Sequence, residues 1–153
     1  MTGIPNQYHW RFNGSIRNFF RVTMALYIIL LFGYTGFSKL MDTHTLFTTL
    51  RNAPLFLSKQ IAEVFSWFIP ITEIGIAATI IFEDFRKIGL LSSIILLALF
   101  TAYTLWIVFV NPHQPCTCGG IISLLSWKQH LLLNSISLVL ASGGLYLENN
   151  HKK

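Results

Sequence analysis

Charged residues are scarce in this chain. Of its 153 residues only 11% are Asp, Glu, Lys or Arg, whereas 53% are hydrophobic, and the mean hydropathy is +0.57. Soluble domains carry about 25% charged residues, so the chain has too little polar surface to cover a water-soluble globule of its size. The composition therefore argues against an ordinary soluble enzyme or binding domain and indicates an integral membrane protein.

Two further absences narrow the function. No run of basic and aromatic residues forms a nucleic-acid surface, although eleven Lys and Arg outnumber six Asp and Glu. The basic residues instead flank the apolar runs, as membrane insertion requires. Internal repeats and low-complexity stretches are absent from the sequence too, so we expect a single domain over residues 1–153.

Four apolar runs are long enough to cross a bilayer as helices, which takes about 20 residues each. They cover approximately residues 19–39, 61–82, 88–110 and 129–147. Residues 41–59 mix apolar and polar side chains around Pro54, which is typical of an interfacial segment. Residues 121–127 are too short to cross and are also expected at the interface. The predicted fold class is all-α, an integral membrane four-helix bundle with short interfacial segments.

Basic residues near the helix ends predict the orientation, because Lys and Arg are enriched on the cytoplasmic side. In this prediction residues 1–21 form a polar, basic leader to the first helix and residues 148–153 form a polar tail. One side of the bundle collects Arg11, Arg17, Arg21, Arg86, Lys87, Lys152 and Lys153. The other side collects Lys39, Arg51, Lys59 and Lys128. We therefore expect a bacterial inner-membrane protein with both termini in the cytoplasm and the loop after the third helix in the periplasm.

The two cysteines of the chain, Cys116 and Cys118, lie in that loop, which is rich in proline and glycine. In an oxidising compartment a close pair of cysteines normally forms a disulfide. A Cys-x-Cys bridge closes a very small ring, which adds little stability through chain entropy, and its strain raises the reduction potential. The spacing therefore favours a thiol–disulfide redox pair over a structural staple.

Two other interpretations of the cysteine pair stay open. The thiols can be buried or incidental apolar fillers at a helix end. Together with His113, and with His130 as the other nearby donor, they can also hold a soft ion such as Cu(I). A complete metal site needs further ligands, so we predict no metal.

Ionisable residues inside the predicted helices are further candidates, because charges in a bilayer are costly and mark functional sites. Glu73 lies three residues after Pro70 and ten residues beyond Glu63, which is about 15 Å deeper along the same helix. We expect Lys39 and Glu63 near the outer end of the bundle, where they can pair. Lys39, Glu63 and Glu73 are therefore assigned either to a proton or quinone site beneath the cysteine loop or to charge pairs that fix helix packing.

Aromatic and small residues bear on the same choice. A flat apolar pocket for a quinone would be lined by Trp67, Trp106, Trp127 and Tyr103, although such residues more often form core or interfacial belts. Close helix packing is expected at small residues of the first two helices, namely Gly33, Gly36, Gly75, Ala77 and Ala78.

Four motifs give the chain a resemblance to the MauE/DoxX group of redox-associated membrane proteins. They are FGYTGFSKL at 32–40, IPITE at 69–73, FTAY at 100–103 and CTCGG at 116–120, the last followed by Trp127 and Asn134. The resemblance implies a four-helix membrane protein tied to the disulfide chemistry of exported proteins. It gives Cys116 and Cys118 the redox role, and Lys39 and Glu73 match recurring polar positions of the group.

The resemblance does not extend to a specific client. Methylamine-utilisation members of the group assist the maturation of a disulfide-rich dehydrogenase, and they typically read Cys-Gly-Cys-Phe-Gly in this loop. This chain instead has Thr117 between its cysteines and Gly119 and Gly120 after them.

Our leading hypothesis is a membrane thiol–disulfide oxidoreductase component that acts on or with exported proteins, for example a thioredoxin-like partner. Electrons would pass to or from a membrane quinone, the only candidate cofactor. Four-helix disulfide-generating enzymes usually need a second cysteine pair, so the chain either uses one pair directly or is a subunit of a larger complex. The alternatives are a non-enzymatic accessory or assembly subunit of a membrane or envelope complex, and a small transporter or metal-handling protein.

Overall fold

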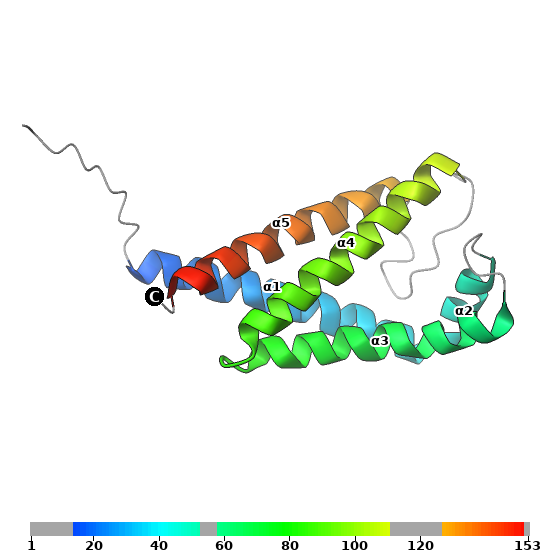
Figure 1. The fold of residues 1–153 in the computed structure, drawn as a ribbon, viewed down its shortest axis with the longest axis horizontal. Helices are drawn as coiled ribbons and strands as arrows, with labels where there is room; N and C mark the ends of the chain where they lie inside the picture. The colour runs from blue at the N-terminus through cyan, green and yellow to red at the C-terminus, as the bar shows by residue number, and fades with distance from the viewer. Residues whose placement is uncertain (1–13, 53–57, 111–126, 152–153) are drawn as a thin grey trace, which may run out of the picture.

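The computed structural model describes residues 14–52, 58–110 and 127–151. These residues form five helices, α1 (Gly14–Met41), α2 (Thr43–Asn52), α3 (Lys59–Ile81), α4 (Arg86–Val110) and α5 (Trp127–His151) (Figure 1). No strand occurs in these three ranges. All the helices except α2 are long and apolar enough to cross a membrane by length and composition. The predicted all-α, four-helix integral membrane fold is confirmed.

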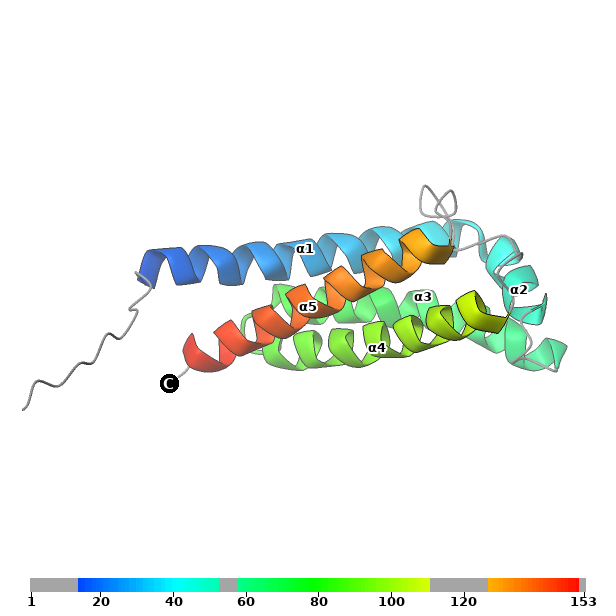
Figure 2. The same cartoon turned by 90° about the horizontal axis from the view of Figure 1, so that it is seen from above.

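The long helices lie side by side, and the two ends of the bundle differ (Figures 1 and 2). One end, which we call the turn end, holds the start of α1, the α3–α4 turn and the last turn of α5. The opposite end, the α2 end, holds α2, the end of α4 and the start of α5. Within the bundle, α1 packs most extensively on α3, and α4 on α5.

Two helix boundaries differ from the prediction because polar residues continue the helices past the apolar runs. Helix α1 begins at Gly14, within the predicted leader. Helix α5 continues to His151, so the prediction that residues 148–151 form a tail is wrong. Of the second predicted interfacial segment, Trp127 is the first residue of α5, and residues 121–126 lie outside the described ranges.

The first predicted interfacial segment contains the amphipathic helix α2. The Thr45 backbone N–H donates to Asp42 Oδ1 at 3.1 Å and so caps the helix. Hydrogen bonding from Thr45 also lowers the pKa of Asp42, since it stabilises the carboxylate. Leu46 and Leu50 bury one face of α2 against Ala62 of α3.

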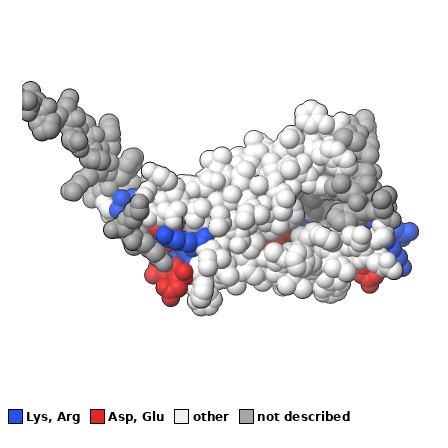
Figure 3. All heavy atoms as spheres, in the orientation of Figure 1, with Lys and Arg blue, Asp and Glu red and all other residues white. Residues whose placement is uncertain are grey.

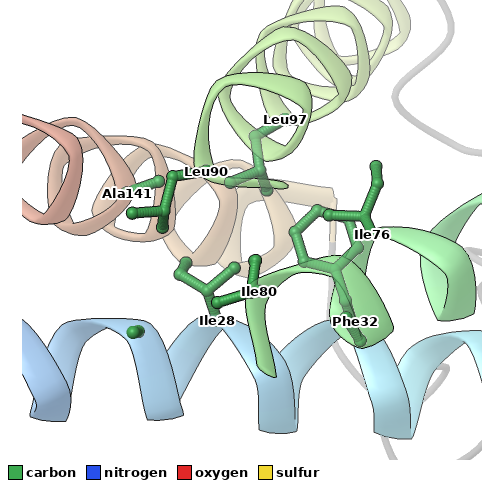
Figure 4. Close-up of a cluster of buried hydrophobic side chains, with 9 residues drawn as sticks. Ile28, Phe32, Ile76, Ile80, Leu90, Leu97 and Ala141 are labelled. Atoms are coloured by element: carbon green, nitrogen blue, oxygen red, sulfur yellow. The ribbon is translucent and has the colours of Figure 1, made fainter. Parts of the chain in front are cut away.

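The core is a narrow apolar column between the four long helices. It contains Ile28 and Phe32 of α1, Ile76 and Ile80 of α3, Leu90 and Leu97 of α4, and Ala141 of α5 (Figure 4). Large apolar side chains also cover the outside, as expected where lipid rather than water is the solvent. In Figure 3 the charged atoms gather at the two ends of the visible face, apart from a small coloured patch inside a hollow near the α2 end.

Close helix approach depends on fewer glycines than the sequence predicts. A Cβ on Gly36 would lie 2.9 Å from Ile74 Cγ1 and 3.1 Å from Glu73 Cβ, so α1 touches α3 there. Gly33 and Gly75 have nothing within 4 Å of such an atom, and the prediction is wrong for them. The contact at Gly36 brings the last turn of α1 against the middle of α3.

Candidate functional site

A buried ion pair joins α1 to α3 next to the Gly36 contact. The Lys39 ammonium donates to Glu73 Oε1, and the two side chains are only 11% and 2% exposed. The predicted Lys39–Glu63 pair is wrong, because Lys39 pairs with Glu73 instead, whereas Glu63 is exposed. Ten residues of α-helix rotate a side chain by about 1000°, so Glu63 points roughly 80° away from the direction of Glu73.

Side chains from all four long helices surround this ion pair. The Lys39 Nζ atom lies 5.1 Å from the centroid of the Phe100 ring on α4, a cation–π distance. A cavity of about 40 Å³ lies beside the pair and is lined partly by His130 and Asn134 of α5. We call it the buried polar cavity and define it by its polar residues, Thr35, Lys39, Glu73, His130 and Asn134.

The size of the buried polar cavity limits what it can hold. At about 40 Å³ it has room for water molecules, whereas sites for organic ligands measure about 300–1,000 Å³. The residues around the Lys39–Glu73 pair therefore do not fit a quinone ring. For a metal ion they supply two ligands, Glu73 and His130. In the described ranges no three His, Cys, Asp or Glu side chains cluster closely enough to hold a metal ion.

A larger and more open cleft of about 300 Å³ lies between α2 and α3 at the α2 end. His44 and Phe47 of α2 and Lys59, Glu63 and Trp67 of α3 contribute to its lining. Of the aromatic residues predicted to form a quinone pocket, Trp67 lies in this cleft, whereas Tyr103 and Trp106 are not among its lining residues. The side chain of Trp127 lies outside what the structure describes.

A second buried charge cluster, which was not predicted from the sequence, lies at the turn end. Glu148 is 1% exposed, and its Oε2 atom lies 3.4 Å from Arg21 Nη1 and 4.0 Å from Arg86 Nη1. Arg86 also lies 3.5 Å from the exposed Glu83, and its Nε donates to the Ile80 carbonyl at 3.2 Å. Arg21 of the predicted leader, Arg86 at the start of α4 and Glu148 of the predicted tail thus link α1, α4 and α5.

Helical spacing contains the signal for both clusters. The buried residues of α1 are Arg21, Ala25, Ile28, Phe32 and Gly36, and Lys39 follows three positions later. This three- and four-residue spacing marks one helix face, and a charged residue continues that face at each of its two ends. The spacing shows that Arg21 belongs to the interior, although its position next to an apolar run suggests a topology signal.

The predicted redox residues Cys116 and Cys118 lie outside the described ranges, as does His113. The helices that precede and follow that segment are described. Helix α4 ends at Val110 and α5 begins at Trp127, and both of these helix ends lie at the α2 end of the bundle (Figures 1 and 2). His130 of the buried polar cavity lies three residues into α5.

Comparison with known protein families shows to which family the chain belongs. The sequence model of a family described as methylamine utilisation protein MauE matches residues 17–147. The chain belongs to the MauE family. The match includes most of each membrane helix of this MauE-family protein, together with Lys39, Glu73, Cys116 and Cys118. No curated protein and no solved structure gives a significant match.

Family membership and fold agree on a coarse description. This MauE-family protein is a multi-pass membrane protein with four apolar helices. Its family suggests an accessory role in the membrane, and the MauE part of the resemblance noted from the sequence is confirmed.

Proposed function

We propose that this MauE-family protein is a membrane accessory protein that performs thiol–disulfide exchange with exported proteins through Cys116 and Cys118. The observation that carries the proposal is the placement of the flanking helix ends. The segment with both cysteines joins α4 to α5, whose facing ends lie at the α2 end (Figure 1). Lys39 of the buried ion pair is in the last turn of α1, directly before α2.

The exchange balances with a dithiol protein as the only co-reactant. A thiolate of the partner attacks one sulfur of the Cys116–Cys118 disulfide, which breaks that bond and forms a mixed disulfide. The second partner thiolate attacks the mixed disulfide, releasing a partner disulfide and two thiols on this chain. Two electrons and two protons pass from the partner to Cys116 and Cys118, and the reverse sequence reduces the partner.

The proposed orientation places the α2 end in the periplasm of a bacterial inner-membrane protein, with both termini in the cytoplasm. Basic side chains that are buried and paired inside the bundle are poor topology signals, which removes Arg21, Arg86 and Lys39 from the comparison. By sequence position, the remaining basic residues that flank helix ends of the turn end are Arg11, Arg17, Lys87, Lys152 and Lys153, against Arg51, Lys59 and Lys128 for the α2 end. The excess toward the cytoplasm persists.

The test is a redox titration of Cys116 and Cys118 in native membranes. Differential alkylation in defined thiol buffers, read by mass spectrometry, gives the midpoint potential of the pair. We expect a midpoint well above about −300 mV, the region of catalytic rather than structural disulfides, and trapping of a mixed disulfide by Cys118→Ser. A pair that stays oxidised in every buffer, or stays reduced and unreactive, would contradict the exchange function.

A second candidate function is a non-enzymatic assembly subunit of a membrane or envelope complex. The presence of only one cysteine pair favours it, because four-helix disulfide-generating enzymes usually shuttle electrons through two. Under this alternative the Cys116→Ser and Cys118→Ser variants keep full function, and the protein co-purifies stably with its partner. Loss of function in both variants, with normal membrane levels, excludes it.

A further inference from the structure

Polar atoms without partners converge on the buried polar cavity. Within the described ranges the structure has four buried side-chain nitrogen or oxygen atoms that make no hydrogen bond. Three of them are Glu73 Oε2, His130 Nδ1 and Asn134 Nδ2, and all three residues line this one cavity. Buried polar groups are almost always hydrogen-bonded, so these three atoms require partners other than those that the described residues supply.

The volume of the cavity fits water as that partner. A water molecule needs about 10–15 Å³ of such space, so the cavity of about 40 Å³ has room for about three or four. The hydrogen-bonding capacities match as well. The Asn134 amide donates, the Glu73 carboxylate accepts, and a neutral imidazole accepts at an unprotonated Nδ1. A single water that accepts from Asn134 and donates to Glu73 and His130 would satisfy all three atoms.

We propose that the buried polar cavity is a hydrated proton-transfer site, in which water held by Asn134 connects the Glu73 carboxylate to the His130 imidazole. Its role rests on the proposed exchange function. Each thiol of the Cys116–Cys118 pair must lose or gain a proton during exchange, and His130 is in the first turn of the helix that follows them. In one direction His130 Nδ1 accepts a proton from Glu73 through the water while the ring releases its Nε2 proton, and the reverse relay takes a proton up at Nε2 and delivers one from Nδ1 to Glu73.

The ionisable groups around the cavity suit this role. Lys39 faces it from α1, Glu73 from α3 and His130 from α5, whereas α4 contributes the Phe100 ring that lies against the Lys39 ammonium. The lysine compensates the carboxylate charge, so a proton can reside on Glu73 or leave it without creating an isolated charge in the bundle. Imidazole changes its charge near neutral pH, which makes it the usual proton carrier in proteins.

The hydration is tested by hydroxyl-radical footprinting of the full chain in lipid nanodiscs, because water bound inside a protein produces labelling at buried side chains. Leu97 and Leu90 form a matched pair on α4, with 2% and 1% exposure, of which only Leu97 lines the cavity. We expect at least fivefold more labelling at Leu97, and loss of the difference in Asn134→Leu. If that variant does not fold, His130→Phe fills the cavity from another position. Equal labelling of Leu97 and Leu90 in the wild type would overturn the proposal.

The proton role has its own readout, the rate at which dithiothreitol reduces the Cys116–Cys118 disulfide in nanodiscs between pH 5 and 8. The ratio of the wild-type rate to the His130→Gln rate removes the pH dependence of the reagent. We expect this ratio to change at least fivefold across the range, while the same ratio for Glu63→Gln, an exposed acid outside the cavity, stays constant. A constant His130→Gln ratio overturns proton transfer. A Cys116–Cys118 pair that does not react contradicts the exchange function itself, and with it the proton role. The footprinting experiment tests the hydration of the cavity independently of that result.

Discussion

The Lys39–Glu73 pair leads to a quantitative prediction about the stability of the bundle. Removing one member of a buried ion pair leaves an uncompensated charge and costs about 3–5 kcal/mol, whereas replacing both members by apolar residues is often neutral or stabilising. We therefore expect Lys39→Met and Glu73→Leu to lower the free energy of unfolding by about 3–5 kcal/mol each. The double variant should lie within about 1 kcal/mol of the wild type or above it.

The two single variants should not be equal. Glu73 lies in the middle of α3 with 2% exposure, and its short side chain cannot carry a carboxylate left without Lys39 to the membrane interface. Lys39 lies in the last turn of α1, and its long side chain can move toward the interface when Glu73 is gone. Lys39→Met should therefore destabilise the protein more than Glu73→Leu.

The assay is reversible unfolding in mixed dodecylmaltoside and dodecyl sulfate micelles, followed by far-UV circular dichroism. Glu63→Leu is the matched control, because this exposed acid on the same helix should change the unfolding free energy by less than about 0.5 kcal/mol. The reasoning is refuted if each single variant costs under about 1 kcal/mol, or if the double variant loses the sum of the two single losses.

Three further outcomes follow from other contacts and use the same unfolding assay. Glu148→Gln should lower the free energy of unfolding by about 3–5 kcal/mol, because it leaves two arginines near a neutral buried group. Glu83→Gln, at 77% side-chain exposure, should lower it by under about 1 kcal/mol. Equal losses in the two variants would contradict the role of burial. Gly36→Ala should lower the free energy of unfolding by about 1–3 kcal/mol through overpacking. Gly33→Ala, with open space around the added Cβ, should not destabilise the protein. The reverse order of the two losses would contradict the described α1–α3 contact. Tyr27→Phe should cost about 0.5–1.5 kcal/mol by removing a 2.9 Å hydrogen bond between α1 and α5, and an unchanged unfolding free energy would mean that this bond does not form.

The membrane helices were predictable because the bilayer imposes a length that apolar runs must meet. Their polar ends were not, since Arg21 and Glu148 carry charges next to apolar runs, where a topology signal is the usual explanation. The two residues are 127 positions apart, and no local pattern shows that they meet. What the sequence does contain is the three- and four-residue spacing that continues the interior face through Arg21.

The candidate site was predictable in part, because ionisable residues are rare inside membrane helices. Lys39 and Glu73 stand out as ionisable residues inside apolar runs, but their pairing depends on rotation about α3 as well as depth, and depth alone suggested Glu63. Asn134 and His130 meet Glu73 only because α5 packs against α1, which a single sequence does not show. Thus the charges could be found, but the cavity between them could not.

The order of the charged partners along the chain has a consequence for biogenesis. In both buried pairs that involve α1, the basic member lies in α1, which is synthesised before α3 and α5, and the acidic member follows 34 or 127 residues later. Lys39 and Arg21 lie near opposite ends of α1, where long basic side chains can reach the lipid headgroups until their acidic partners are inserted. Glu73 neutralises the first when α3 enters, and Glu148 neutralises the second only when α5 arrives. The arrival of α5 therefore completes the charge pairing of α1, and a chain truncated before α5 should leave Arg21 unpaired and be degraded faster by quality-control proteases.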